Sequence, residues 1–590
     1  MTVPTVNLLN WLARLPFLTV DDLALLTGSP APDVETALRE LARAGQVDSI
    51  TPSSPEMAST RLFVLTEWAR RQTATGKQVS LPLNARDVFR RLASLEATVA
   101  LNVFAAGLVT ASRRTPDAGL DDLWTLPRSR SADAWWPPGV HAFGSFRIGT
   151  AHAPFFVFVD RAAAPSAHRA TLVAGWYRFR EGPQPWGTGD VPPVLILCPG
   201  PAREDAWSQH VLASADRRRL PPLRVLMATR ASLGDRPDGP HWRPADGSSR
   251  ASLIERLGVK PAPTKYSPPH PLRLASCPSE ATDRATPLHR WAQETARDRR
   301  SASRLELFAA LSLMTSEVEK RLLDCLGRHP LLTETELATV LQVQPRVATL
   351  ALERALTNGL ITTFGTTAPA HYCLTPTALG LLAARDEVPV RRYARHSSVT
   401  ALPGAHGGRV PTLVHQFEHT VGTNSFFVSW LRHVRGGGPR LVTWLNAAES
   451  AVRLESAGSR RWLRPDGSGT LIADHCVRRF FLEWDRGTER LQVIAFKLAR
   501  YGEYFRSQSG HGKDIPTLLF VTTTPQREEL TWRVGAATTE QSKQYLMTTT
   551  ASLLERLGPF GAVWRSHAQQ HRTRWPGSAP EHEYSLEDRR

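Results

Sequence analysis

The sequence predicts a mixed α and β protein of several domains, in which one two-domain unit occurs twice. A chain of 590 residues is longer than one hydrophobic core normally serves. Helix-spaced apolar residues alternate along it with short apolar runs that are typical of strands. Short stretches of the first half also recur in the second half, in the same order.

The recurring stretches lie about 320 residues apart. LEATVALNVF from Leu95 resembles FEHTVGTNSFF from Phe417, and FFVFVDR from Phe155 resembles FFLEWDR from Phe480. VLMATRASL likewise resembles YLMTTTASL, and upstream LTVDDLALL resembles LTETELATV and LTEWA resembles LTPTA. Five matches in one order favour a tandem duplication, and we call its halves the first and second copy.

Each copy opens with three helical patterns and an alternating hairpin pattern. In the second copy these are residues 316–330, 332–343, 344–359 and 360–375; in the first they are 8–17, 19–28, 31–45 and 46–66. Thr333 is a candidate helix N-cap, and Gly45 and Gly359 are candidate C-terminal stops. Three helices and a two-stranded wing predict a winged helix, which lays its third helix in the major groove of DNA. Such domains also serve as protein–protein modules.

The two predicted third helices differ in charge. The second offers four side chains suited to DNA contacts, namely Gln344, Arg346, Thr349 and Arg354. The first offers Asp33 and Glu35 in its leading turns, where they would repel phosphate. We therefore expect the second winged helix to bind double-stranded DNA and the first to be a dimer or partner module.

The rest of the second copy alternates helices and strands. A helix is predicted over 414–435, strands over 440–448, 468–476 and 478–486, a helix over 488–508, and a buried strand over 515–524. The strand 478–486 carries Glu483 and Asp485, which alternation places on one face. Buried carboxylates need a partner, and a metal, an arginine or water could each supply it.

A strand, an acid-bearing strand, a helix and a strand in this order resemble the core of the restriction-endonuclease-like superfamily. Its Pro-Asp and acid motifs match Pro465–Asp466 and Glu483, while Asp485 stands where a lysine is usual. Lys497, in the next helix, is a candidate substitute for that lysine. The resemblance implies a catalytic set of Asp466, Glu483, Asp485 and Lys497, with Asp466 and Glu483 holding Mg²⁺ or Mn²⁺ if the site is active.

Taken with the winged helix, several motifs resemble the replication-relaxation family. They are the H-x-V-x-x-N-x-F helix from His419 to Phe426, the PDG at Pro465, FFLEWDRGTE and KLARYGEYF. The resemblance is good over 315–565 and degenerate over 1–235. It implies a role in plasmid replication and relaxation of plasmid DNA, and implies DNA metabolism more firmly than cleavage.

The first copy lacks the predicted metal site. In the alignment Phe158 takes the place of Glu483, Leu172 that of Lys497, and Pro138 that of Asp466. Asp160 and Arg161 remain in place of Asp485 and Arg486, which we interpret as a structural ion pair kept in both copies. The first α/β domain is therefore predicted to be a degenerate, inert core.

His415, Glu418 and His419 fit an H-x-x-E-H zinc-peptidase pattern. The aligned first-copy helix has Ala93 and Ala97 at the histidine positions, and no downstream glutamate helix offers a third ligand. We interpret His419 and Glu418 as residues that cap the helix or pack it against the sheet.

Composition limits the classes of protein. The 72 Lys and Arg against 55 Asp and Glu give a net charge of +17, which favours a polyanionic partner over solubility charge alone. Five scattered cysteines indicate neither a disulfide framework nor a zinc ribbon. Apolar runs such as TLVAGW and TLLFV are strand-sized, and the N-terminus lacks a signal-peptide pattern. We expect a cytoplasmic protein that does not enter membranes.

These observations predict six segments. They are a winged helix over 1–75, a degenerate endonuclease-like α/β domain over 85–235, a Pro- and Arg-rich linker over 236–314, a winged helix over 315–385, an endonuclease-like α/β domain over 410–565, and a polar tail over 566–590. The leading interpretation is a DNA-binding protein of the replication-relaxation type. The alternatives are a Mg²⁺-dependent DNA endonuclease or nickase and a non-catalytic scaffold in a plasmid mobilisation complex, with a relaxase or another plasmid replication protein as a partner.

Overall fold

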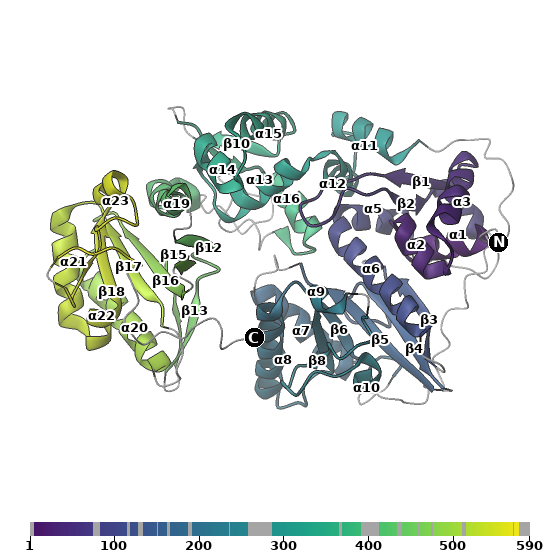
Figure 1. The fold of residues 1–590 in the computed structure, drawn as a ribbon, viewed down its shortest axis with the longest axis horizontal. Helices are drawn as coiled ribbons and strands as arrows, with labels where there is room; N and C mark the ends of the chain where they lie inside the picture. The colour runs from purple at the N-terminus through teal and green to yellow at the C-terminus, as the bar shows by residue number, and fades with distance from the viewer. Residues whose placement is uncertain are drawn as a thin grey trace. The chain divides into compact units, whose positions relative to one another are not determined.

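The computed structural model is a mixed α and β protein of several domains, as the sequence predicts (Figure 1). It divides into unit 1, Met1–Lys320 with Gly380–Arg392, and unit 2, Arg321–Leu379 with Tyr393–Arg590. The structure describes residues 5–74, 83–114, 118–127, 134–149, 151–161, 166–186, 191–234, 236–257, 286–364, 369–390, 412–433, 439–456, 459–473, 476–509, 515–569 and 571–576.

Unit 1 begins with a small helical domain. Helices α1 (Thr5–Arg14), α2 (Val20–Thr27) and α3 (Ala31–Arg43) precede strands β1 (Val47–Ile50) and β2 (Leu62–Leu65), which pair antiparallel. Helix α4 (Glu67–Ala74) follows. Thr19 and Asp22 form a capping box at the start of α2, which satisfies N–H groups of its first turn. Gly45 follows α3 with a φ of 70°, a backbone conformation that glycine adopts without strain.

A domain with the same order of helices and hairpin strands, and one additional short strand, recurs around residues 317–385. Helix α13 (Glu317–Arg328), strand β9 (Leu332–Thr333), helices α14 (Glu334–Leu341) and α15 (Pro345–Thr357), strands β10 (Ile361–Phe364) and β11 (His371–Leu374), and helix α16 (Pro376–Arg385) follow one another. The strand order is β10-β11-β9. The predicted N-cap Thr333 is confirmed, and it forms a capping box with Glu336.

Each unit contains one six-stranded sheet. The first consists of β3 (Ala118–Thr125), β4 (Ala142–Ile148), β5 (Ala151–Val159), β6 (Val194–Cys198), β7 (Val225–Thr229) and β8 (Arg243–Pro244). The second consists of β12 (Arg440–Asn446), β15 (Gly467–Ala473), β16 (Cys476–Asp485), β17 (Thr517–Thr522), β18 (Leu546–Thr550) and β19 (Arg565–Ser566). In this order of neighbours the pairings are antiparallel, antiparallel, parallel, parallel and antiparallel in both sheets.

Helices cover both faces of each sheet (Figure 1). In unit 1, α6 (Leu95–Ser112) shares a core with β3 and β5, and α7 (Ser166–Glu181) and α8 (Pro201–Arg218) share a second core on the other face. In unit 2, α19 (Phe417–Arg432) contributes to one core and α20 (Leu491–Ser509) to the other. The central strands β6 and β7 are buried along their whole length, as parallel strands between two helical layers must be.

The remaining helices are shorter or flank these layers. They are α5 (Ala85–Ala93), α9 (Arg230–Leu233), α10 (Leu253–Leu257), α11 (Leu288–Arg297), α12 (Arg304–Met314), α18 (Thr412–His415), α21 (Pro525–Thr538), α22 (Glu540–Tyr545) and α23 (Ala551–Leu557). Strands β13 (Val452–Ser456) and β14 (Ser459–Leu463) form a separate hairpin between β12 and β15.

Equivalent side chains make equivalent contacts in the two units. The Asn102 amide donates to the carbonyls of Pro16 and Phe17, and the Asn424 amide donates to that of Pro330. The Trp242 indole donates to Pro237 and the Trp564 indole to Pro559. Glu204 is buried against Arg250, and Glu528 against Arg572. Both halves of the chain thus use one internal framework.

Three expectations from the sequence need correction. The predicted linker 236–314 contains β8, α10, α11 and α12 in its described parts, and Trp242 is fully buried. The predicted polar tail begins inside β19, and Trp575 is 7% exposed in the core beside α19. The expectation that all apolar runs are strand-sized is also wrong, because helix α6 is long and apolar enough to span a bilayer. However, 72% of this helix is buried inside the structure, as in a core helix. No other helix among the described residues passes that test.

Candidate functional site

The strand β16 carries two buried carboxylates near its end. Glu483 is 4% exposed and Asp485 is 5% exposed. Alternation along the strand places both on the face of Phe481, which packs in the core formed with α20. The other face of the strand, with Phe480 and Leu482, packs in the core that contains α19. The sequence leaves open whether a metal, an arginine or water binds these two carboxylates. In the structure Glu483 and Asp485 have different partners.

Glu483 is bound by two residues of α20. The Tyr501 hydroxyl donates to its Oε1 at 2.6 Å, and the Lys497 ammonium lies 3.3 Å from its Oε2. Burial raises the pKa of the Glu483 carboxyl, the charge of Asp466 adds to this rise, and Lys497 and Tyr501 oppose it; the resulting pKa is about 8, from an ordinary value of 4.5. This pKa favours the protonated form of Glu483 at neutral pH, even with Lys497 beside it.

Asp466 lies immediately before β15, and hydrogen bonds to the backbone of the neighbouring strand β16 fix its position. Its backbone N–H donates to the carbonyl of Leu482 at 3.0 Å, and its Oδ2 accepts the N–H of Trp484 at 2.8 Å. These two bonds flank Glu483 on the neighbouring strand. Asp466 therefore stands beside Glu483, in agreement with its effect on the pKa of that residue.

His419, from α19, completes the group. Its Nε2 lies 3.1 Å from Oδ1 of Asp466. Burial opposes protonation of this imidazole, but the hydrogen bond to Asp466 and the charges of Asp466 and Glu483 outweigh burial and raise the pKa of His419. The helix residue that we expected only to cap or pack therefore contacts a candidate site carboxylate.

Lys497 is shared between two carboxylates. Its ammonium lies 2.8 Å from Oε1 of Glu489 and 3.3 Å from Oε2 of Glu483. Burial opposes protonation, but Glu483, Glu489 and Asp466 together raise the pKa of Lys497 above its ordinary value. Lys497 thus stays positively charged at the site, and a third of its side chain, 33%, remains exposed.

Asp485 is separate from this group. Its Oδ2 accepts Nε of Arg527 at 2.5 Å, and its Oδ1 accepts Nη2 of Arg527 at 3.3 Å and the N–H of Gly487 at 2.9 Å. The neighbouring Arg486 instead pairs with Glu418 of α19. The predicted ion pair between Asp485 and Arg486 is therefore wrong, because the arginine that binds Asp485 comes from α21.

The donor set of Asp466 and Glu483 fits a magnesium-like cation only in part. Among the described residues, no three His, Cys, Asp or Glu side chains form a group that could hold a metal ion. Mg²⁺, however, is commonly held by one or two carboxylates and keeps several waters. Asp466 and Glu483, two adjacent carboxylates, meet that smaller requirement. A bound cation would compete with Lys497 for the oxygens of Glu483 and with His419 for those of Asp466.

The first half of the chain has different residues at the equivalent position of its sheet. The N–H of His141 donates to the carbonyl of Val157, and its Nδ1 accepts the N–H of Val159 at 3.2 Å. Asp466 makes the same two bonds to β16, so His141 stands where Asp466 stands in the second copy. The predicted correspondence of Pro138 with Asp466 is wrong, because the loop before β4 aligns through His141 and not through its prolines.

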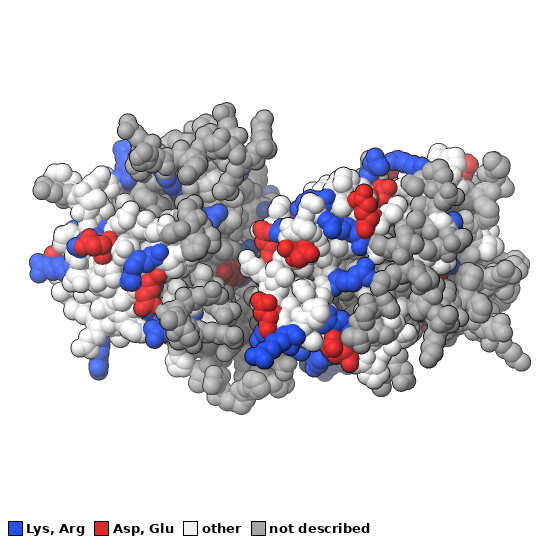
Figure 2. Space-filling view, turned by 90° about the horizontal axis from the view of Figure 1, so that it is seen from below, with Lys and Arg blue, Asp and Glu red and all other residues white. Residues whose placement is uncertain are grey.

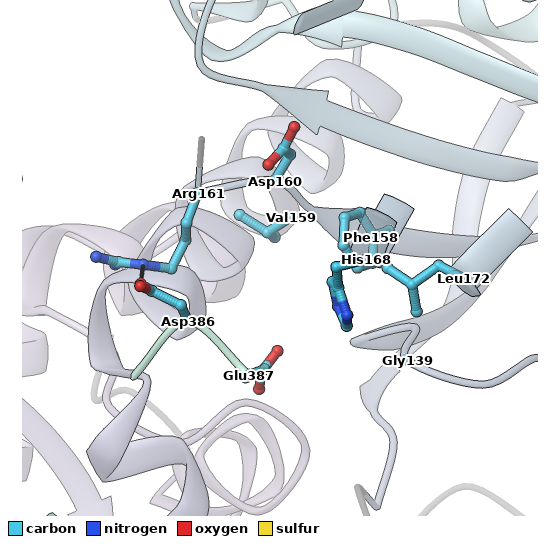
Figure 3. Close-up of a pocket in the computed structure, with 9 residues that line it drawn as sticks. All are labelled: Gly139, Phe158, Val159, Asp160, Arg161, His168, Leu172, Asp386 and Glu387. Carbon is cyan, nitrogen blue, oxygen red and sulfur yellow. Dashed lines mark hydrogen bonds and ion pairs between the residues drawn. The ribbon is translucent and has the colours of Figure 1, made fainter. Parts of the chain in front are cut away.

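The neighbours of His141 have changed with it. Phe158 occupies the position of Glu483, and its ring lies 5.3 Å from that of His141 and 6.0 Å from that of Trp176. Leu172 lines the same small cavity as Phe158 (Figure 3). Aromatic and aliphatic contacts therefore replace the carboxylate, the lysine and the tyrosine hydroxyl of the second copy.

Two carboxylates of the segment after α16 enter this first-copy position (Figure 3). Oε2 of Glu387 lies 2.9 Å from Nε2 of His141, and Oε1 of Glu387 accepts the hydroxyl of Ser94 at 3.2 Å. Asp386 is bound by Nε of Arg161 at 3.2 Å. The first copy thus binds acids from a distant part of unit 1, whereas the second copy supplies its own.

The predicted DNA-contacting residues lie on or beside α15. Gln344 is the exposed N-cap residue, and Arg346 and Arg354 are exposed on the helix. Thr349 is half-buried, and its hydroxyl contacts Glu334 and the carbonyl of Pro345. Three of the four side chains are therefore open to solvent, and the fourth is used within the domain.

Sequence reasoning missed Tyr501 and Arg527 and undervalued His419. Tyr501 follows Lys497 by one helical turn, so helix spacing could have placed both beside one strand residue. Arg527 lies in the first turn of α21, and only the fold brings it to Asp485. In the sequence alignment Ala97 takes the place of His419. The same half of the chain has Phe158 in place of Glu483. The two differences occurring together are a signal that could have linked His419 to the site.

The comparisons with known proteins assign one family to part of the chain. Residues 323–518 match the family described as replication-relaxation, so the expected resemblance is confirmed over this range. The matched range begins in α13 and ends in β17, and it includes α15, Asp466, Glu483 and Lys497. No curated protein and no solved structure matches the chain.

The raised pKa of Glu483 predicts a pH-dependent stability. A folded-state pKa of about 8, above the ordinary 4.5, means that the folded state binds the proton more tightly than the unfolded state. Stability is then present below the unfolded pKa and is lost as pH rises through the folded pKa. The melting temperature of the wild type should fall between about pH 5 and about pH 8 by more than that of Glu483→Gln. An equal pH dependence of the melting temperatures of the two proteins in scanning calorimetry would contradict this. The control is Glu540→Gln, which makes the same substitution at an exposed glutamate of the same unit.

Proposed function

We propose that this chain is a DNA-binding protein of the replication-relaxation type that contacts double-stranded DNA through a winged helix over 315–385. The family match over 323–518 supports a role in replication or relaxation. The observation that carries the proposal is the exposed surface of α15, with Arg346 and Arg354 on the third helix of its domain.

The topology around α15 supports the winged-helix assignment. Helix, strand, two helices and a hairpin occur in the order α13, β9, α14, α15, β10 and β11, and β9 pairs with β11 beside β10. In winged-helix proteins the third helix of such an arrangement enters the major groove. Ala348, Ala351, Leu352 and Ala355 form the buried face of α15, so its other face is free to meet a partner.

The corresponding helix of the first copy is less suited to DNA. Helix α3 exposes Asp33 and Glu35 near its N-terminus, together with Glu40 further along. Its exposed basic residues are Arg39 and Arg43. Acidic groups in the leading turns would oppose the phosphate backbone. We assign this domain to protein contacts, within the chain or with a plasmid replication protein or relaxase.

The net charge of +17 agrees with a polyanionic partner, but it does not indicate which surface of the protein would bind that partner. On the face drawn in Figure 2, the described basic and acidic side chains lie interspersed over the surface. We assign specific contact to the exposed arginines of α15. From the family resemblance we infer that this activity serves the replication of a plasmid or mobile element.

Substitution of Arg346 tests the proposal. Arg346→Ala should weaken duplex binding by about 1–3 kcal/mol if the side chain reads a base edge. Wild-type affinity should also fall steeply between about 50 mM and about 200 mM salt, because phosphate contacts release counterions. Fluorescence anisotropy with labelled duplexes, including sequences from the host replicon, measures both, and Arg39→Ala on α3 is the matched control. Salt-independent affinity, or binding to no duplex at low salt, would remove DNA from the account.

A second candidate function is metal-dependent DNA cleavage by the α/β domain over 410–565. The observation that favours it is the meeting of Asp466, Glu483 and Lys497, with the ammonium of Lys497 3.3 Å from Glu483. The sheet that carries them, with two parallel pairings beside an acid-bearing strand, supports the endonuclease-like assignment. Asp485 is left out of the catalytic set because Arg527 and Gly487 occupy its oxygens.

The residues of this site can be given roles. Asp466 and Glu483 would hold Mg²⁺ or Mn²⁺, which supplies an activated water and charge stabilisation at phosphate when bound. Lys497 would place a positive charge beside the reacting phosphate. His419 would orient the carboxylate of Asp466 through its 3.1 Å contact. Tyr501 holds Glu483 from inside the core, so the carboxylate is positioned by groups that do not reach the DNA.

We also propose that the chain arose by tandem duplication. The identical strand order of the two sheets, the paired asparagines, tryptophans and buried glutamate–arginine contacts, and the five sequence matches support it. Under this proposal the first copy kept the fold and lost the carboxylate pair. The second copy kept both.

Plasmid nicking tests the cleavage proposal. The purified full chain should convert supercoiled plasmid to nicked circles only with Mg²⁺ or Mn²⁺, and Asp466→Asn and Glu483→Gln should each abolish the conversion because each removes one cation ligand. Lys497→Ala should lower it strongly, while Glu540→Gln leaves it unchanged. Agarose gels read the outcome directly. Nicking that persists in Asp466→Asn, or that needs no metal, would show that these acids are not the catalytic groups.

A further inference from the structure

Helix α15 exposes aliphatic side chains as well as arginines. Val347 is 38% exposed and Leu350 is 47% exposed. Leu356, near the C-terminal end of the same helix, is 38% exposed. Among the described residues, no other helix carries three exposed large apolar side chains. Single exposed residues of this kind are common, so it is their grouping on one helix that needs a physical explanation.

Helical spacing places Val347 and Leu350 on one face of α15. They are three residues apart, so their side chains are neighbours on the helix surface. Arg346 precedes Leu350 by four residues and Arg354 follows it by four, so both arginines belong to the same face. All four side chains are exposed, and we call them the exposed strip. Leu356 lies roughly a third of a turn around the helix from Leu350, outside this strip.

The opposite side of α15 fixes the direction of the exposed strip. Four residues of that side pack inside the domain, namely Ala348, Ala351, Leu352 and Ala355. Thr349 is half-buried, and its hydroxyl contacts Glu334 of α14. Because the helix is held along this side, Val347 and Leu350 cannot turn into the core and remain in contact with solvent.

The equivalent helix of the first copy has polar side chains at these positions. Helices α3 and α15 each contain 13 residues, and their buried residues fall at the same positions along the helix. In this register Asp33 takes the position of Val347. Thr36 takes that of Leu350, and both first-copy residues are exposed. The fold therefore does not require apolar residues at these two positions.

We propose that Val347 and Leu350 contact the 5-methyl groups of thymine in the major groove, so that α15 reads duplex sites that contain thymine. Thymine presents this methyl group in the major groove, where apolar side chains contact it. The N-terminal residues of a recognition helix reach the base edges, and both residues lie in the first two turns of α15. Gln344, three residues before Val347, carries an amide of the kind that pairs with adenine, the partner of thymine.

This inference rests on the proposed function, because it takes duplex DNA as the ligand of α15. The charges of the exposed strip favour DNA over a protein partner. Arg346 and Arg354 flank its apolar side chains, and the first turn of α15 has no acidic residue. The acid of this helix, Glu353, lies further along, in the third turn. Two aliphatic side chains also bury far less than the roughly 800 Å² per partner of a stable protein interface.

Replacement of thymine by deoxyuridine tests the proposal, because it removes only the methyl group. The probe is a duplex that the full chain itself selects from a random-sequence library, prepared once with thymine and once with uracil. The wild type should bind the uracil form about fourfold more weakly for each contacted thymine, the factor for exposing one buried carbon group of this size. The double variant Val347→Ala/Leu350→Ala should lose most of this difference. Fluorescence anisotropy measures both affinities.

The control is Leu530→Ala, which truncates a leucine of α21 that is 41% exposed. This variant should keep the full difference between the two forms of the duplex. Alanine is the best helix former, so the double variant should melt at or above the wild-type temperature. A lost preference for thymine then reports a lost contact and not an unfolded domain.

The outcomes separate this inference from the proposed function. Selection of no duplex by the wild type would overturn both. Binding of the thymine and uracil forms with equal affinity would refute the methyl contacts and leave the DNA-binding proposal standing. A thymine preference that persists in the double variant would also refute them. If light scattering shows that the wild type self-associates and the double variant does not, the exposed strip is an interface between copies of this chain and the inference falls.

Discussion

The buried carboxylate at the end of the third strand of each sheet is the constraint on which the two units are built. A carboxylate at 1% or 5% exposure, as in Asp160 and Asp485, is stable only with a paired charge and filled hydrogen bonds. In both units an arginine from the helix after the next strand supplies these: Arg203 for Asp160 and Arg527 for Asp485. This pair ties the end of the strand to the helix that follows the next strand, which is α8 in unit 1 and α21 in unit 2.

On this shared framework the two copies treat one position in opposite ways. The second copy places Asp466 beside Glu483 and balances them with Lys497 and His419. The first copy places His141 there and binds Glu387 and Asp386 from the segment after α16. Charges of opposite sign meet at this position in both units. In unit 2 the carboxylates belong to the sheet region itself, and Lys497 beside them is 33% exposed. A cation can compete with Lys497 for the carboxylates, and a phosphate can compete with the carboxylates for Lys497. Phe158, which takes the place of Glu483 in unit 1, offers no charged group to either.

The sequence predicted what depends on local pattern. The mixed fold, the capping box at Thr333 and the face shared by Glu483 and Asp485 follow from helix and strand periodicity and from the residue types at helix ends. Partners distant in the chain could not be predicted in this way: Tyr501 reaches Glu483 across a strand–helix connection, Arg527 reaches Asp485 across a further strand, and Asp386 reaches Arg161 from another domain's end. The stretch 236–314 is predicted to be linker because it is rich in Pro, Ser and Arg. A strand as short as β8 shows no alternation that would reveal it, although its pairing with β7 completes the sheet.

The central proposal is that, among the described residues, only unit 2 has a carboxylate pair, Asp466 and Glu483, that is placed to hold a divalent cation. Isothermal titration of the full chain with Mn²⁺, in the absence of DNA, tests it most directly. The account predicts that a single ion binds per chain, that Asp466→Asn and Glu483→Gln each remove the binding, and that His141→Phe in the first copy leaves it unchanged. Binding that survives Asp466→Asn and Glu483→Gln, or no binding to the wild type, would contradict it.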